Sequence, residues 1–284
     1  MRLAEDPAIA FVELNNENTL LNLDAALAAE LPAPFAPALR AEWQAWLKQR
    51  YESLPQAAAA WNENVQPLGR DLLRDAGFEN GAGAWTIQGR GTGVCESRTV
   101  DDTPHGPALE VTVHETGSVP WAYQVHRVGL PIENGSAYTL TFAGRAEPER
   151  TVGISLRFAH PPWRFVSSPK KITLTPEWTE HEVTFEASGV EPEIPVRLSF
   201  NLGADTGMFQ LASPSLRTGR RLFRPESAAT LSGLSLPTTA WPPRAAADFR
   251  RFLVAAERSY VLRLRRHLFD TVGVESLVID TQAS

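Results

Sequence analysis

A carboxylate beside an amide, at the end of an apolar segment, is the first feature of this sequence that suggests chemistry. Residues 8–14 form a nearly continuous apolar run, and the polar residues that follow include Asn16 and Glu17. Such a run is typical of a strand that is covered on both faces, as in a parallel sheet. A carboxyl group that is partly buried there has a raised pKa and serves as a general acid or base. The pair is short and common, so a helix N-cap cluster is the alternative interpretation.

The elements predicted around this pair are strands separated by helices. After the first strand, the apolar spacing becomes helical over residues 20–31, 36–51 and 54–61, and again over residues 245–270. Residues 274–279 then form a second apolar strand. This order predicts two consecutive β/α units with parallel strands, and the end of the first strand is where such units hold catalytic groups.

The residues between these units follow a different pattern. From about residue 69 to residue 217, short runs of alternating apolar and polar residues are separated by Gly, Pro, Asn and Asp. In residues 152–158, for example, Val, Ile, Leu and Phe share one strand face. Evenly spaced strands with turn residues between them predict an antiparallel sandwich or jelly roll. The predicted domains are residues 1–68, 69–217 and 218–284, and the outer two form one interrupted unit.

Composition excludes several classes of protein. The chain has 284 residues, a formal net charge of −6 and one cysteine, Cys95. A single cysteine excludes an internal disulfide and a metal site built from several cysteines. No basic cluster with interleaved aromatics favours nucleic acid, and no apolar run is long enough to cross a membrane. The sequence therefore predicts neither nucleic acid nor membrane as a partner, and it leaves the compartment open.

The segment from Asp6 to Asn18 resembles a known strand. With Asn16 and Glu17 at its end, it is similar to the fourth barrel strand of the clan A retaining glycoside hydrolases, which are cellulase-like and β-galactosidase-like (β/α)8 enzymes. Residues 249–282 look like the helix and strand that follow. The resemblance implies that Glu17 is the general acid/base and that Asn16 contacts the 2-hydroxyl of the sugar. It also implies a partial (β/α)8 barrel of about two β/α units, interrupted by the antiparallel β-sandwich.

The sequence departs from that family in one respect. Retaining hydrolysis requires a second carboxylate as nucleophile, and in this clan it ends the seventh strand. The predicted strands stop at about the fifth, and Glu275 precedes its strand instead of ending it. We therefore expect a fragment of a retaining β-glycoside hydrolase that is inactive alone. Its intact parent is expected to be secreted or periplasmic, and catalysis needs no cofactor.

A second resemblance covers residues 72–216. The stretch from Leu72 to Gly81 contains Gly-Phe-Glu and is followed by Trp85, which is similar to the opening of CenC-type carbohydrate-binding modules of families 4 and 9. This resemblance implies a jelly roll that binds poly- or oligosaccharide. It also implies a structural Ca²⁺ at Glu79, although the last strand has Ser213 and Pro214 where the family has an aspartate.

The candidate sugar-binding residues lie on several predicted strands and loops. Trp163 follows two prolines and is expected at a loop tip, which favours it over the strand tryptophans. Trp121 and Tyr123 share one strand face while Gln124 takes the other, so one site holds all three only if a bulge intervenes. The full set is Trp163, Trp121, Tyr123, Gln124, Arg157 and Asn201. Two other functions stay open: a non-catalytic carbohydrate-binding protein, and a chain in which the jelly roll is a structural spacer.

Overall fold

The chain divides into two compact units. One is formed by residues 1–63 and 223–284, and the other by residues 64–222. The predicted boundaries at residues 69 and 217 lie close to these divisions, where the hydrophobic pattern changes. The computed structural model describes residues 4, 6, 8–16, 19–23, 28, 31–89, 95–226, 229–238 and 241–279. None of the helices within these ranges is long and apolar enough to cross a membrane.

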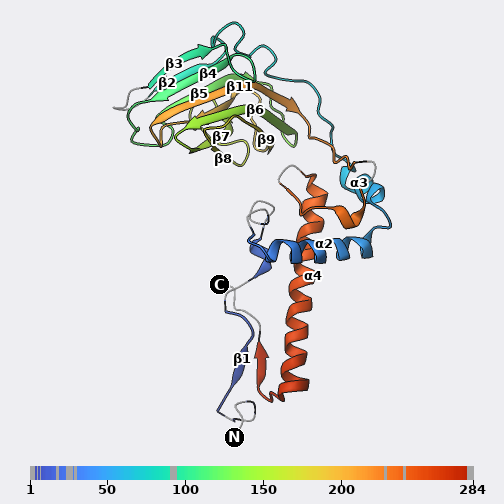
Figure 1. Ribbon diagram of the computed structural model, residues 1–284. Helices are drawn as coiled ribbons and strands as arrows, with labels where there is room; N and C mark the ends of the chain where they lie inside the picture. Colours follow the sequence, from blue (N-terminus) through green and yellow to red (C-terminus); the bar gives the residue numbers. More distant parts are fainter. Residues whose placement is uncertain are drawn as a thin grey trace. The chain divides into compact units, whose positions relative to one another are not determined.

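The unit of residues 64–222 is a sandwich of two antiparallel sheets (Figure 1). One sheet has the strand order β2-β5-β10-β7-β8, and the other has the order β3-β4-β11-β6-β9. The strands of the first sheet are β2 (Thr86–Gly89), β5 (Tyr123–Leu130), β7 (Arg150–Phe158), β8 (Lys170–Leu174) and β10 (Val196–Asn201). Those of the second are β3 (Cys95–Val100), β4 (Ala108–Val113), β6 (Ala137–Glu147), β9 (Thr179–Glu186) and β11 (Gly207–Thr218). The predicted antiparallel sandwich is therefore confirmed.

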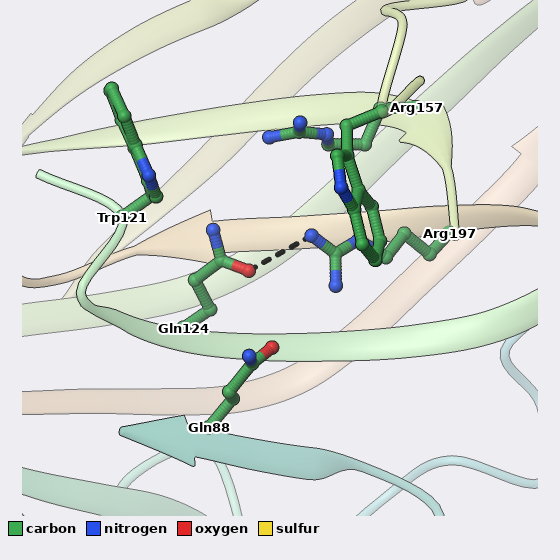
Figure 2. Close-up of a pocket in the computed structure, with 6 residues that line it drawn as sticks. Gln88, Trp121, Gln124, Arg157 and Arg197 are labelled. Atoms are coloured by element: carbon green, nitrogen blue, oxygen red, sulfur yellow. Dashed lines mark hydrogen bonds between the residues drawn. The ribbon is translucent and has the colours of Figure 1, made fainter. Parts of the chain in front are cut away.

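The two sheets share one core because the side chains of each strand alternate between its faces. Ile154 and Leu156 of β7 are buried in this core. Phe200 of one sheet meets Phe209 of the other, with ring centroids 6.2 Å apart. Each fully buried side chain of this size stabilises the fold by about 1.5–3 kcal/mol. The opposite face of the first sheet carries the polar side chains shown in Figure 2.

The segments through which the chain enters and leaves the sandwich are hydrogen-bonded to each other. The backbone N–H of Gly69 donates to the carbonyl of Thr218 at 2.8 Å. Nearby, the Asp71 carboxylate accepts hydrogen bonds from the backbone N–H of Leu216 at 3.1 Å and from the Ser215 hydroxyl at 2.7 Å. The chain therefore enters and leaves this unit through segments that lie side by side.

The other unit combines helices with a short pair of strands. Its helices are α2 (Phe35–Arg50), α3 (Leu54–Asn62) and α4 (Pro243–His267), with short helical turns η2 (Leu20–Asn22), η3 (Leu231–Gly233) and η4 (Leu268–Val272). Strands β1 (Phe11–Glu13) and β12 (Leu277–Ile279) pair in parallel. The helices predicted for residues 36–51, 54–61 and 245–270 are present. The helix predicted for residues 20–31 is described only in part, and its described start is a 3-10 turn.

The strand pair differs from the expected buried strand. Phe11 is 53% exposed and Leu277 is 65% exposed. Within the described residues this sheet consists of β1 and β12 alone, so no further strand flanks either of them. The prediction that the first strand is covered on both faces is therefore wrong for the residues described here. The parallel pairing itself agrees with two β/α units, whereas the larger barrel stays a prediction.

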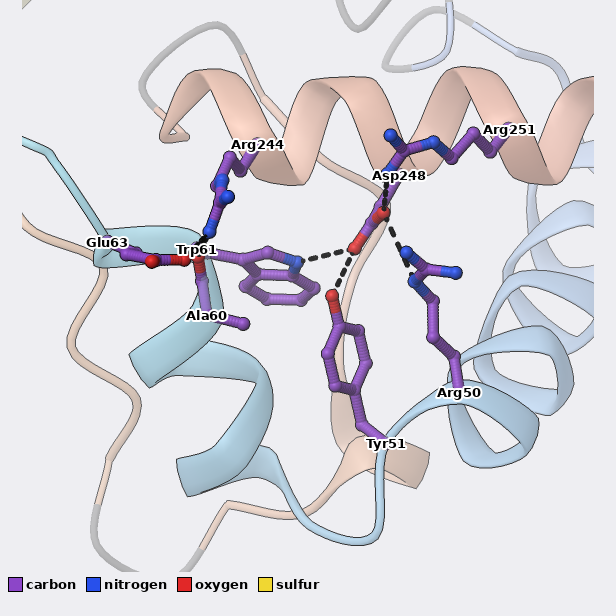
Figure 3. Close-up of polar contacts among 8 residues, drawn as sticks. All are labelled: Arg50, Tyr51, Ala60, Trp61, Glu63, Arg244, Asp248 and Arg251. Atoms are coloured by element: carbon purple, nitrogen blue, oxygen red, sulfur yellow. Dashed lines mark hydrogen bonds and ion pairs between the residues drawn. The ribbon is translucent and has the colours of Figure 1, made fainter.

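A buried carboxylate joins the helices of this unit (Figure 3). Asp248 of α4 is 2% exposed. Its Oδ2 accepts hydrogen bonds from the Tyr51 hydroxyl at 2.5 Å and from the Trp61 indole N–H at 2.9 Å. Its Oδ1 lies 2.9 Å from Nη1 of Arg251 and 3.3 Å from Nε of Arg50. One side chain thus connects α4 with α3 and with the C-terminal end of α2.

We expect Asp248→Ala to lower the free energy of unfolding of this unit by about 3 kcal/mol, because it leaves buried donors without an acceptor. Asp248→Asn keeps one acceptor oxygen and should cost less. Scanning calorimetry of the full chain measures the effect, and the transition of the β-sandwich should stay unchanged. Asp270→Ala is the matched control, because Asp270 is exposed near the end of the same helical segment. Equal losses for Asp248→Ala and Asp270→Ala would contradict the structural role assigned to Asp248.

Candidate functional site

Polar side chains form rows across the outward face of the β2-β5-β10-β7-β8 sheet. Gln88 of β2 pairs with Gln124 of β5, which pairs with Asn201 of β10. Farther along the strands, Arg197 of β10 pairs with Arg157 of β7. Side chains of paired residues lie next to each other on one face. The strand register therefore brings together amide and guanidinium groups that are far apart in the sequence.

Hydrogen bonds fix the orientation of these groups. Arg197 donates from Nη2 to Oε1 of Gln124 at 3.0 Å. Gln124 in turn donates from Nε2 to Oδ1 of Asn201 at 3.2 Å. Arg197 is only 5% exposed although it lies on the outward face. The network therefore holds its members in place before any ligand arrives.

A shallow pocket lies over these rows (Figure 2). Its volume is about 90 Å³, which is too small to enclose a whole ligand. The side chains that line it are Gln88, Trp121, Gln124, Arg157, Trp163 and Arg197. Figure 2 shows Trp121 on one side, Arg157 and Arg197 on the other, and Gln124 between them. A ligand would therefore lie across the sheet face and place one group in the pocket.

Two tryptophans from separate loops border the pocket. Trp121 precedes β5 in a turn and is 53% exposed. Trp163 lies in the loop after β7, where its backbone N–H donates to the carbonyl of His160 at 3.0 Å. The φ angle of Trp163 is 58°, in the left-handed region that bulky residues rarely adopt. Backbone strain of this kind, of order 1–3 kcal/mol, is often found at ligand sites.

Arg157 lies between aromatic rings at the edge of the pocket. Its guanidinium carbon lies 6.0 Å from the ring centroid of Trp163 and 5.1 Å from that of Phe165. Burial lowers the pKa of Arg157. Its Nε is buried and has no hydrogen-bond partner among the described residues. The positive charge is therefore partly desolvated and is held in a fixed position.

His126 occupies the next row of the same face and is neutral near pH 7. It pairs with Ser199 of β10. Burial, and secondly the charge of Arg197, lower the pKa of His126 to about 4. The positive charge on this face at neutral pH therefore comes from arginine and lysine.

The structure brings together most of the sugar-binding residues predicted from the sequence. Trp121, Gln124, Arg157 and Trp163 line one pocket, and Asn201 is hydrogen-bonded to Gln124 at its edge. Their role in binding stays a prediction.

Tyr123 is a correction to that set. It is 1% exposed in the sandwich core, where a ligand on the outward face cannot contact it. Trp121 is not buried in the core in the same way. It lies in the turn before β5, so strand alternation does not fix the direction of its side chain.

Two pocket residues, Gln88 and Arg197, were not predicted from the sequence. Both lie on strands that pair with neighbours distant in the chain. The alternation in Val196–Asn201 was a usable signal, since Arg197 and Asn201 share a face when Phe200 faces the core.

The remaining predicted site residues lie elsewhere. Glu17, the predicted acid/base, lies outside the described residues, and its neighbour Asn16 is exposed. Glu79, the predicted calcium ligand, is exposed near the start of the sandwich. Among the described residues, no group of three or more His, Cys, Asp or Glu side chains is placed to hold a metal ion. A Ca²⁺ at Glu79 would therefore depend partly on oxygens other than carboxylates.

A family model matches most of the sandwich. Residues 70–207 match the model of a family described as a carbohydrate binding domain, CBM_4_9. This match supports a carbohydrate-binding module. The matched segment includes every residue that lines the pocket. Comparison with curated proteins gave no match.

Several solved structures match part of this chain. A structure titled "CBM4 structure and function" is 21% identical, with a TM-score of 0.40, and the match covers 47% of this chain and 86% of that one. The second N-terminal cellulose-binding domain from Cellulomonas fimi β-1,4-glucanase C is 22% identical, with a TM-score of 0.42 and coverage of 52% and 94%. The CBM22-1 xylan-binding domain from Paenibacillus barcinonensis Xyn10C is 10% identical, with a TM-score of 0.40 and coverage of 54% and 97%.

The lowered pKa of His126 predicts that the module loses stability in acid. The unfolded chain has an ordinary histidine pKa of about 6.5. Neutral His126 therefore makes its full contribution to the free energy of unfolding at pH values above about 6.5. That contribution falls by up to about 3 kcal/mol as the pH falls toward 4. Calorimetry at pH 7.5 and pH 4.5 should show a larger loss for the wild-type module than for His126→Gln. Parallel losses in the two proteins would contradict this origin, since carboxylates titrate alike in both.

Proposed function

We propose that the module binds poly- or oligosaccharide across the outward face of the β2-β5-β10-β7-β8 sheet. The observation that carries this proposal is the pocket, in which two tryptophans from separate loops border a polar strip of amide and guanidinium groups. The family match of residues 70–207 supports the same class of ligand.

The chemistry of the pocket suits a sugar. A pyranose ring has an apolar face of C–H groups and a rim of hydroxyls. Trp121 and Trp163 offer large rigid apolar surfaces at low entropic cost. Gln88 and Gln124 supply amide groups, which both donate and accept hydrogen bonds. An open face with a shallow depression suits a chain that extends beyond the contacted sugar.

We expect Trp163→Ala to weaken glycan binding at least about tenfold, since it removes the aromatic surface and the cover over Arg197. Trp121→Ala should act in the same direction. Affinity electrophoresis of the full chain on soluble glucans, xylans, mannans and pectins measures the loss. The matched control is Trp178→Ala, because Trp178 packs on Ala108, Ala143 and Ala212 of the opposite sheet. Failure of the wild-type chain to bind any glycan would refute the proposal.

A second proposal concerns the unit of residues 1–63 and 223–284. We infer that it derives from a retaining β-glycoside hydrolase in which Glu17 is the acid/base and Asn16 contacts the sugar. The parallel pairing of β1 with β12, with helices between them in sequence, supports this proposal. Asn16 and Glu17 follow the C-terminal end of β1, where (β/α)8 enzymes hold their catalytic groups.

A second carboxylate is needed for retaining hydrolysis. Glu257 of α4 is a carboxylate that contacts the segment after β1 among the described residues. It accepts hydrogen bonds from the Thr19 hydroxyl at 2.8 Å and from the backbone N–H of Leu20 at 3.0 Å. These bonds give Glu257 a structural role at the start of η2, so we do not assign the nucleophile to it.

We therefore expect no turnover of aryl β-glucosides, β-xylosides or β-mannosides by this chain. Release of nitrophenol from the nitrophenyl glycosides, compared with that of Glu17→Gln, is the measurement. Turnover that disappears in Glu17→Gln would show a complete catalytic pair and would contradict the assignment of an incomplete site. Turnover that persists at an undiminished rate in Glu17→Gln would exclude Glu17 as the acid/base.

A further inference from the structure

Charge is divided unequally between the two sheets of the module. None of the described residues in strands β2, β5, β7, β8 and β10 is an aspartate or a glutamate. The strands of the opposite sheet carry glutamates in β3, β4, β6 and β9. The chain as a whole has a net charge of −6. The charged residues in the strands of this sheet are therefore all basic, in a chain whose net charge is negative.

The basic residues of the first sheet differ in what their side chains contact. Arg127 donates to the carbonyl of Ala84, and Arg150 donates to the carbonyls of Leu202 and Asp205. Those two guanidinium groups serve the fold. Arg157 and Arg197, which the register places side by side, line the pocket instead. Lys171 of β8 pairs with Gly153, in the row that contains Asn201.

Several arginines elsewhere in the module are paired with carboxylates. Arg98 pairs with Glu110 at 2.6 Å, and Arg221 pairs with Glu182 at 2.8 Å. Close to the pocket, Arg164 pairs with Glu191 at 2.5 Å. No carboxylate lines the pocket among the described residues, and Arg157 has no ion pair among them within 4.0 Å.

The hydrogen-bonding capacity of the pocket side chains also favours a negatively charged ligand. Guanidinium groups only donate, so two arginines contribute no acceptor for a sugar hydroxyl. The oxygen of Gln124 already accepts a hydrogen bond from Arg197. A ligand that supplies acceptors and negative charge therefore fits this pocket better than one that supplies hydroxyls alone. A planar guanidinium matches a carboxylate with two parallel hydrogen bonds.

We propose that the preferred ligand is an acidic polysaccharide, and that the carboxylate of a uronic acid residue binds Arg157 beside Arg197 while Trp121 and Trp163 contact the sugar ring. This proposal rests on the proposed function, because it names the class of glycan that the same face binds. A charge held by rings at 5.1 and 6.0 Å is already positioned, so little entropy is lost when the anion arrives.

Matched pairs of polysaccharides test the proposal with the full chain. Glucuronoxylan is compared with the same polymer after its carboxyl groups have been reduced to alcohols, and polygalacturonate with its fully methyl-esterified form. Calorimetric titrations are run at about 50 and 300 mM NaCl, since screening weakens ionic contacts and leaves neutral ones. We expect the acidic member of at least one pair to bind at least about tenfold more tightly, with a preference that shrinks in salt.

Variants assign that preference to one side chain. Arg157→Gln should lose about tenfold or more in affinity for the acidic polymer and less for the neutral one, so the ratio of the two affinities should fall. Arg157→Lys keeps the charge but not the planar fork of donors. Its affinity for the acidic polymer should lie between those of the wild type and Arg157→Gln. Arg98→Gln is the matched control, because it removes the same charge from the opposite sheet. An equal loss in Arg98→Gln would indicate a net-charge effect and would overturn the assignment.

The outcomes separate the two proposals. Equal affinity for both members of every pair would overturn the acidic ligand and leave glycan binding intact. No binding to any polymer would overturn glycan binding itself. Equally tight binding of dextran sulfate or polyaspartate would show attraction to any polyanion and would overturn recognition of a uronic carboxylate.

Discussion

The alternation of side chains along β5, β7 and β10 is the constraint on which both the core and the candidate site depend. Over residues 123–126, 152–158 and 196–201 of these strands the apolar residues face the second sheet and the polar residues face outward. A shift of register by one residue would exchange the two sets. Ring contacts such as that of Phe200 with Phe209 hold the register, because they fill the space between the sheets. The positions of Gln124, Arg157 and Arg197 thus follow from packing on the other side of the sheet.

The outward face of this sheet has an unusual property for a solvent-facing surface. Gln124, His126, Ser199 and Arg197 are all buried there. Burial of polar groups is costly unless they are hydrogen-bonded. The bonds from Arg197 to Gln124 and from Gln124 to Asn201 offset part of that cost. They also make the face rigid, which favours binding because fewer rotamers are lost when a ligand docks.

The sequence was sufficient for the sandwich and for most of the pocket, because period-two alternation and turn residues are local signals. Trp163 and Arg157 were found in this way. Tyr123 was misassigned because the sequence does not show where β5 begins, and the strand starts at Tyr123 itself. Gln88 and Arg197 were missed because strand register is a long-range property. Exposure of Phe11 was also unexpected, since an apolar run indicates a buried strand only when neighbouring elements cover it.

The joined ends of the sandwich have a consequence for how the whole chain folds. Residues 63 and 223 of the helical unit are separated by the full length of the module in sequence. The bond from Gly69 to Thr218 brings the two ends of that excursion together once the module has folded. The entropy of loop closure grows with the logarithm of the length of flexible chain. A prefolded module therefore acts as a short tether, and the helical unit can assemble from its two halves almost as if the intervening chain were a turn.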